Sequence, residues 1–148
     1  MPTDQQLFDQ LSFYTLSLRD PFFLHQNAVD AFAAQHVDEE TKPIKTVFAL
    51  IGLYLTLEKG FTGRQVQLAH MRLAKQRKHW PKIPPTTQST SITVADALAA
   101  EPGPLRDQAI RDWCQAVWQT WQSQREIIVK LAQEELDIQQ TEKPHREQ

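Results

Sequence analysis

The sequence predicts an all-α protein: a single-domain helical bundle of about five to six helices around a buried central helix. The first observation is the stretch IKTVFALIGLYLTLEK at 44–59, whose apolar side chains cover every side of a helical wheel. A helix that is apolar all round must be covered by its neighbours. The second is that the flanking segments carry apolar residues at helical spacing, and the third is that no segment alternates as a strand would.

The length and composition favour one soluble domain. The 148 residues are enough for a normal core, and 41% apolar with 23% charged residues is typical of a folded chain. The N-terminal MPTDQQLFDQ lacks the basic and apolar parts of a signal peptide, and 44–59 is too short to cross a bilayer comfortably. We therefore expect a cytoplasmic protein that does not bind membranes, with one domain at 1–137 and a fraying polar tail at 138–148.

Capping signals divide the first half of the chain into helices. Thr3 or Asp4 can cap a first helix at 3–18, and Asp20-Pro21 is the pattern that starts a second helix, which we expect at 21–37. Pro43 begins the central helix and Gly60 ends it, because glycine accepts the left-handed backbone of a C-cap. Gly52 lies in the middle of that helix, where we expect another helix to approach closely.

The second half contains two further helical regions and one long connection. Thr62 can cap a fourth helix at 63–78, and the proline-rich segment 79–91 follows as irregular chain. The sequence Thr93-Val94-Ala95-Asp96 resembles a capping box that opens a short helix ending at Ala100. From 105 to 136 the apolar pattern predicts one long helix or two helices with a bend.

Three histidines are expected on inward faces of helices. His25 and His36 lie on the apolar stripe of the second helix, and His70 lies on that of the fourth. His25 and His36 are eleven residues apart, about 16 Å along a helix, so they cannot bind one ion together. A shared site would have to be assembled between helices, whereas the simpler alternative is that each histidine is hydrogen-bonded separately.

Two carboxylates complete this possible site. Glu58 ends the central helix, where the helix dipole disfavours a negative charge and calls for a cationic partner such as Lys59, Arg64 or a histidine. Asp30 lies on the side of the second helix opposite the apolar stripe. The leading hypothesis is a binding module whose inter-helix site takes a divalent metal ion or a small polar ligand. Its ligand-binding residues are His25, Asp30, His36, Glu58 and His70, of which His25, His70 and Glu58 would bind the metal.

A basic segment supports an alternative function. Residues 59–95 contain seven lysines and arginines and no acidic residue, although the whole chain has a net charge of −2. Leu68 and Met71 fall on the same helical face as the cations, so the alternative is an interaction module for an anionic or protein partner. The simpler reading is a solvated face on which Leu68 and Met71 pack against a neighbour. The partner-binding cations would be Arg64, Arg72, Lys75 and Lys78.

The sequence offers little support for an enzyme. Cys114 falls on an inward face, and because it is the only cysteine, the sequence excludes an internal disulfide and a cysteine-cluster metal site. No nucleophile or cofactor motif is present, so the catalytic residues and the cofactor are left unassigned, a divalent metal being the one cofactor considered. The acidic balance of the chain disfavours nucleic acid as a partner. Trp118 lies off the inward stripe, which leaves a homodimer through the long C-terminal helix as one alternative.

Several segments together resemble a known bacterial family. They are DPFFLHQNAVDAFAAQH, IKTVFALIGLYLTLEKGFTGRQVQLAHMRLAKQRKHWP, ITVADAL and RDWCQAVWQTW. The resemblance is to the domain of unknown function 5946, covers roughly residues 12–136, and is most specific at 30–36, 50–58 and 66–80. It implies one bacterial, soluble domain without an assigned activity. Some relatives carry an N-terminal cysteine pair that could hold zinc, and this chain has none.

Overall fold

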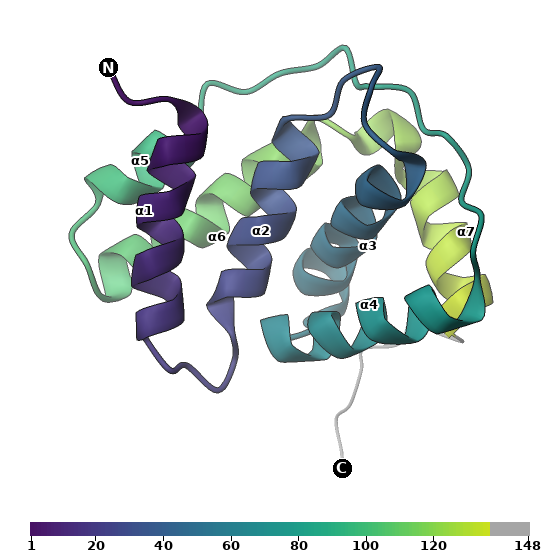
Figure 1. Ribbon diagram of the computed structural model, residues 1–148, viewed down its shortest axis with the longest axis horizontal. Coiled ribbons are helices and arrows are strands. Elements are labelled where there is room, and N and C mark those ends of the chain that lie inside the picture. The colour runs from purple at the N-terminus through teal and green to yellow at the C-terminus, as the bar shows by residue number, and fades with distance from the viewer. Residues whose placement is uncertain (137–148) are drawn as a thin grey trace.

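The structure, a computed structural model, describes residues 1–136 and is all-α over that range, as predicted. The predicted tail at 138–148 lies outside the described residues. The described part contains one short 3₁₀ turn, η1 (Gln122–Gln124), and seven α-helices (Figure 1). The α-helices are α1 (Asp4–Ser17), α2 (Leu24–Gln35), α3 (Pro43–Lys59), α4 (Gly63–Gln76), α5 (Val94–Ala99), α6 (Pro104–Gln119) and α7 (Arg125–Leu136).

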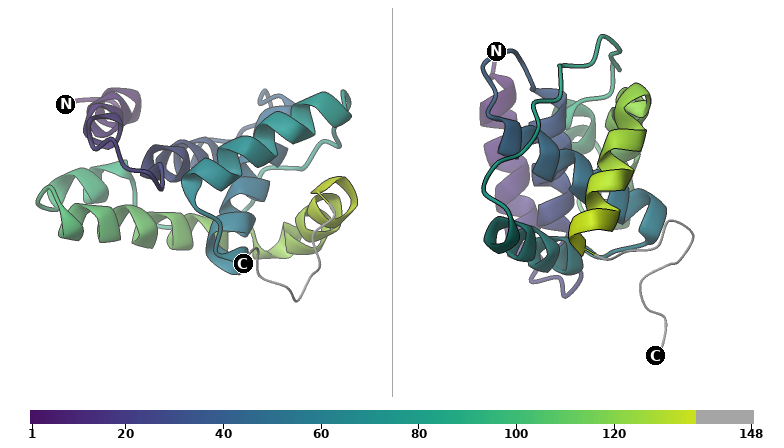
Figure 2. Two further views of the ribbon diagram at one scale, coloured as in Figure 1. Left: turned by 90° about the horizontal axis from the view of Figure 1, so that it is seen from below. Right: turned by 90° about the vertical axis from the view of Figure 1, so that its right-hand side faces the viewer.

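The helices form two layers around α3. Helices α1, α2 and α4 lie on one side of the molecule and α5, α6 and α7 on the other (Figure 2). Helix α3 lies between the layers and contacts α2, α4, α6 and α7. This arrangement covers the helix from several directions, as its all-round apolar sequence requires.

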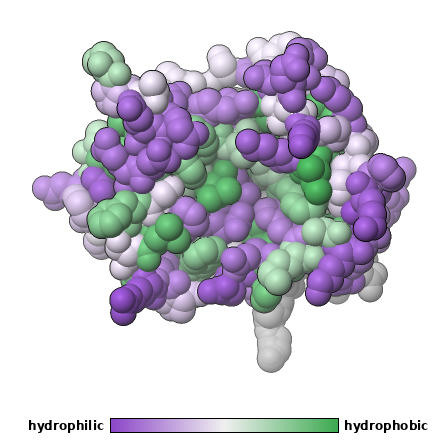
Figure 3. Space-filling model, viewed as in Figure 1, coloured by the Kyte–Doolittle hydropathy of each residue, from purple (hydrophilic) through white to green (hydrophobic). Residues whose placement is uncertain are grey.

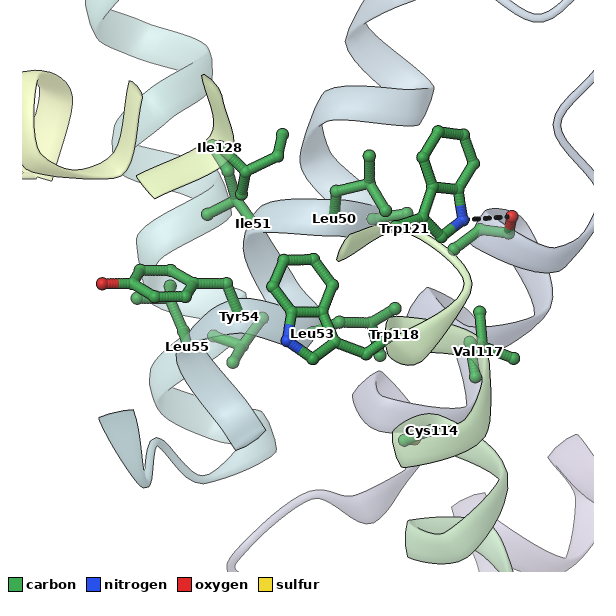
Figure 4. Close-up of a cluster of buried hydrophobic side chains, with 14 of the residues drawn as sticks. Leu50, Ile51, Leu53, Tyr54, Leu55, Cys114, Val117, Trp118, Trp121 and Ile128 are labelled. Atoms are coloured by element: carbon green, nitrogen blue, oxygen red, sulfur yellow. Dashed lines mark hydrogen bonds between the residues drawn. The ribbon is translucent and has the colours of Figure 1, made fainter. Parts of the chain in front are cut away.

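The core is built on α3 and on the tryptophans of the C-terminal half. Leu50, Ile51, Leu53, Tyr54 and Leu55 are almost completely buried. Trp118 of α6 and Trp121, which follows that helix, pack against them (Figure 4). Gly60 ends α3 with a φ of 75°, as predicted for its C-cap.

The indoles of Trp113, Trp118 and Trp121 each donate to an acceptor on an earlier helix. Trp113 Nε1 donates to Gln35 Oε1 at 2.8 Å, and Trp121 Nε1 donates to the Ala34 carbonyl at 3.2 Å. Trp118, which the sequence places off the inward stripe, is also buried. Its ring lies 6.4 Å from that of Tyr54, so the core of this same chain accounts for its position.

The start of α2 differs from the prediction. Both carboxylate oxygens of Asp20 accept backbone N–H groups, from Phe22 at 2.9 Å and from Leu24 at 3.1 Å. Phe23 has left-handed backbone angles of 59° and 60°, so the helix begins at Leu24 rather than at Pro21. As a result Phe22, which would fall on the apolar stripe of a helix beginning at Pro21, lies before α2 and is 61% exposed.

Helix α2 packs on α3 at Gly52, but the group that lies against the glycine is a side chain and not the helix backbone expected there. A Cβ atom at position 52 would lie only 1.9 Å from Asp30 Oδ2, so the carboxyl group of Asp30 occupies the space above the glycine. Asp30 is 2% exposed, and its predicted position on the outer side of α2 is therefore wrong. Helix α2 is covered by α1, α3, α4 and α6, so it has no broad outer side.

The region 105–136 forms two helices, the second of the two predicted alternatives. Helix α6 ends at Gln119, and η1 lets the chain turn before α7 (Figure 1). The long connection between α4 and α5 runs along the surface and is held at several points. Lys82 Nζ donates to the Glu39 carbonyl at 2.7 Å, Gln35 Nε2 donates to the Ile92 carbonyl at 2.8 Å, and the Thr86 hydroxyl donates to the Thr120 carbonyl.

Candidate functional site

The histidines predicted to share a site have separate hydrogen-bond partners. His25 Nδ1 lies 2.9 Å from the Thr15 hydroxyl of α1, whereas His70 Nε2 lies 2.8 Å from the Phe48 carbonyl of α3. The ring of His70 also stacks on that of Phe48. Burial lowers the pKa of both histidines, although the bond to the Phe48 carbonyl raises that of His70.

His36 is not inward-facing, which corrects the sequence prediction. It is the C-cap of α2, and 36% of its side chain is exposed. Its Nε2 lies 3.0 Å from Asp4 Oδ2 and its Nδ1 lies 2.8 Å from the Phe32 carbonyl. The ring therefore joins the end of α2 to the start of α1 at the surface.

Glu58 joins α3 to the C-terminal helices. Arg125 Nε lies 2.9 Å from Glu58 Oε2, and a second guanidinium nitrogen contacts Oε1. Trp118 Nε1 donates to Glu58 Oε2 at 2.8 Å. The bond from Arg125 lowers the pKa of Glu58 most, burial opposes it, and Trp118 lowers it further. Glu58 thus has the cationic partner that the helix dipole calls for, Arg125 of α7, and the charge of Lys59, one of the predicted partners, also lowers its pKa.

The structure does not bring the predicted metal-binding residues together. His25, His70 and Glu58 point to Thr15, Phe48 and Arg125 respectively. Within residues 1–136, no group of three or more His, Cys, Asp or Glu side chains is placed to hold a metal ion. The physical reason is that each side chain is hydrogen-bonded to a different partner on a neighbouring helix.

Asp30 is the buried carboxyl group that the described core leaves incompletely bonded. Gln26 Nε2 donates to its Oδ1 at 3.1 Å, but its Oδ2 has no hydrogen-bond partner. Burial raises the pKa of Asp30 well above its usual value, because an ionised carboxylate loses its hydration there.

One prediction follows from the lowered pKa of His70. Because the folded pKa of His70 is lowered, the unfolded chain takes up its proton first as pH falls below about 6.5. The stability that neutral His70 provides is present above that pH and is lost as pH falls toward the folded value. We expect His70→Gln to reduce the loss of stability between pH 7 and pH 5, measured by urea denaturation. The exposed His79→Gln is the matched control, and equal profiles for the two variants would contradict the prediction.

The predicted basic face of α4 is present at the surface. We define the α4 face by five exposed residues of the helix, Arg64, Leu68, Met71, Arg72 and Lys75, together with the exposed Lys78. Because α4 ends at Gln76 and not at the predicted residue 78, Lys78 lies two residues beyond the helix. Leu68 and Met71 are 55% and 54% exposed, so the alternative in which they pack on a neighbouring helix is wrong. In the space-filling view, hydrophobic side chains over the middle of α4 lie between hydrophilic ones (Figure 3).

The cations of this face have no acidic partners in the described part of the chain. Arg64 lies over the ring of Phe23, and Arg72 donates to Gln76 Oε1 at 2.6 Å. By contrast, Arg77, next to the face, forms an ion pair with Glu135 at 3.0 Å. Within the described residues, Arg77 is therefore paired with an acidic residue of the chain, whereas the four predicted cations are not.

A groove beside the α4 face adds apolar surface. It has a volume of about 320 Å³ and is lined by Phe61, Gln65, Leu68, Ala69, Arg72 and Leu136. Because Leu136 belongs to α7, the groove depends on the packing of α7 against α4, which sequence periodicity does not reveal. Leu68 and Arg72 are shared by the face and the groove, so the two form one continuous surface.

A second cavity, which the sequence did not indicate, lies where α2, α3, α4 and α6 meet. Its volume is about 280 Å³. Asn27, 8% exposed, and Cys114, 1% exposed, are its most buried polar lining residues. The helical wheel of α2 places Asn27 away from the apolar stripe, and only the contact with α3, through Thr56, reveals its buried position.

Comparison with known proteins gives a family but no activity. No helix in the described range is long and apolar enough to span a membrane. No curated protein and no solved structure matches the chain. Residues 3–122 match the Family of unknown function (DUF5946); the match covers α1 to α6 in full and leaves α7 outside. The chain therefore belongs to this family.

Proposed function

We propose that the protein is an interaction module whose α4 face binds an acidic amphipathic helix of a partner protein. The observation that carries the proposal is the exposure of Leu68 and Met71 between cations without acidic partners in the described residues. Exposed apolar groups and unpaired positive charges are the two features that such a helix complements.

The mixture of apolar and basic groups favours a protein partner over a nucleic acid. A phosphate backbone would contact Arg72, Lys75 and Lys78 but would leave Leu68 and Met71 in water. A partner helix with apolar residues at positions i, i+3 and i+7 would cover the two apolar side chains and the adjoining groove. Acidic residues along the edges of that helix would then face the cations of α4.

The apolar and the charged residues of the α4 face would contribute differently to binding. The apolar side chains of the partner would supply most of the affinity, and the surface charges would supply orientation and rate of association. Because exposed charges are screened by salt, binding should weaken as ionic strength rises.

The experiment uses a fluorescent peptide designed as an acidic amphipathic helix, with leucines at the apolar spacing and glutamates on both flanks. We expect Arg72→Glu combined with Lys75→Glu to weaken binding by about tenfold or more, because two attractions become repulsions. Fluorescence anisotropy at low and high salt measures the effect. Leu68→Ser combined with Met71→Ser should weaken binding by a similar factor through loss of apolar contact.

The matched control reverses two exposed cations elsewhere, Lys45→Glu and Lys130→Glu, which leaves the change in net charge identical. Equal binding by the control and the α4 variant would overturn the proposal. A DNA duplex that binds the protein and is unaffected by Leu68→Ser with Met71→Ser would also contradict it, because a nucleic acid would then occupy the surface.

A further inference from the structure

The cavity between α2, α3, α4 and α6 contains one acidic and one basic side chain. Asp20 lies in the turn before α2 and Arg111 lies on α6, and both line the cavity. The two do not form an ion pair, since the three ion pairs of the described residues join other groups. The cavity therefore presents a negative and a positive group that are available to a ligand.

The lining also offers neutral hydrogen-bonding groups. Asn27 Nδ2 donates to the Thr56 hydroxyl at 3.0 Å, and Thr62 lies at the start of α4. Apolar side chains of Phe22, Leu24, Leu57 and Phe61 make up much of the remaining lining. A small cavity with mostly apolar walls and a few placed polar groups is the usual form of a ligand site.

We infer that this cavity binds a small zwitterion of the α-amino acid class. Arg111 would pair with the carboxylate of the ligand, because a guanidinium donates two parallel hydrogen bonds to such a group. Asp20 would accept from the ammonium group. Its two oxygens already accept backbone N–H groups, but a carboxylate has about four acceptor positions, so each oxygen retains one.

The zwitterion fits better than a simple anion or cation. An anion held by Arg111 would also meet the negative charge of Asp20, and a cation held by Asp20 would meet Arg111. A ligand that carries both charges can pair with Arg111 and with Asp20 at once. The apolar side chains of the lining would receive the ligand's own side chain.

The cysteine in the cavity does not suggest covalent chemistry. Cys114 Sγ donates to the Asn27 carbonyl at 3.4 Å, and burial raises the pKa of the thiol. The reactive form of cysteine is the thiolate, so a protonated, hydrogen-bonded thiol is a poor nucleophile. The cavity is accordingly assigned to binding.

The experiment measures binding of each common L-α-amino acid to the full chain by calorimetry and by the shift of the thermal midpoint. For the amino acid that binds best, the N-acetyl derivative removes the ammonium charge and the carboxamide removes the carboxylate. We expect each derivative to bind about tenfold to a hundredfold more weakly than the free amino acid. Saturable binding of none of the amino acids, or equal binding of the derivatives, would overturn the inference.

Variants assign the two charges to residues. Arg111→Gln should weaken binding of the free amino acid by about tenfold or more and leave binding of its carboxamide unchanged, because that derivative lacks the group that Arg111 contacts. Asp20→Asn should likewise weaken binding of the free amino acid, and it should leave binding of the N-acetyl derivative unchanged, because that derivative lacks the ammonium group that Asp20 contacts. Lys130→Gln, an exposed cation on α7, is the matched control. Arg111 is itself exposed, so the variant is expected to fold, and unchanged affinity in it would refute the assignment.

Discussion

Replacing Gly52 with alanine is expected to destabilise the folded protein by about 1–3 kcal/mol, although alanine is the better helix former. The added Cβ would lie 1.9 Å from Asp30 Oδ2 and 2.6 Å from Asp30 Cγ. The side chain of Asp30 is short and buried, and its Oδ1 is held by Gln26, so it cannot move aside freely. The free energy of unfolding from urea denaturation measures the loss.

A second substitution tests whether Asp30 is the cause. In the double variant Gly52→Ala with Asp30→Ala the clash is absent, so we expect most of the lost stability to return. The coupling in this double-mutant cycle should reach about 1 kcal/mol or more, well above the additivity error of independent sites. Additive effects would show that Asp30 and Gly52 are not in contact as described.

The substitution Asp30→Asn is expected to stabilise the protein increasingly as pH rises. The folded pKa of Asp30 is raised, so the folded state holds the proton more tightly than the unfolded chain does. Its contribution to stability is greatest below the unfolded pKa of about 3.9 and is lost as pH rises toward the folded value. The loss amounts to about 1.4 kcal/mol per pH unit in that interval, and asparagine, which does not ionise, should not show it.

The measurement is the difference in unfolding free energy between Asp30→Asn and the unchanged chain at several pH values from 4 upward. Taking the difference cancels the opposite pH dependence of His25 and His70, which both proteins share. Asp9→Asn, at an exposed carboxylate on α1, is the control and should give a nearly flat difference. A flat difference for Asp30→Asn as well would show that this carboxyl group is not held in its neutral form.

Much of the fold could be predicted because it depends on local signals. The caps at Thr3, Thr62 and Thr93 are visible in the sequence, and in the structure each side chain accepts a backbone N–H of its helix. The all-round apolar pattern of α3 likewise leaves little choice but burial. Gly52 indicated that another group packs closely on α3, because glycine lowers the stability of a helix interior and so calls for a packing reason.

The faces of α2 could not be predicted in the same way. A helical wheel separates an apolar stripe from a polar side, but α2 is covered by four other helices. Asp30 and Asn27 are buried on what the wheel treats as its outer side. Phe22 lies on the wheel's inner side but before the helix begins, because Asp20 holds the turn that precedes α2.

The candidate site was predictable only in part. The cations of α4 follow from the sequence, since exposed charges need no tertiary partner to be placed on a helix face. The histidines could not be placed, because the partners of His25 and His70 are a hydroxyl on α1 and a backbone carbonyl on α3. The cavity that contains Arg111 and Asp20 arises from the meeting of four helices, and no single segment contains its pattern.

The hydroxyl of Tyr14 shows how late in synthesis the N-terminal helices obtain their partners. It donates to Asp107 at 2.7 Å and accepts from the Gly103 amide at 2.9 Å, and Gln35 of α2 accepts from Trp113. Contacts between such distant parts of a chain form slowly, because the intervening loop must first be closed. A ribosome must therefore release more than two thirds of the chain before α1 and α2 can complete their packing. Until then the apolar sides of these helices are surfaces that a chaperone can bind.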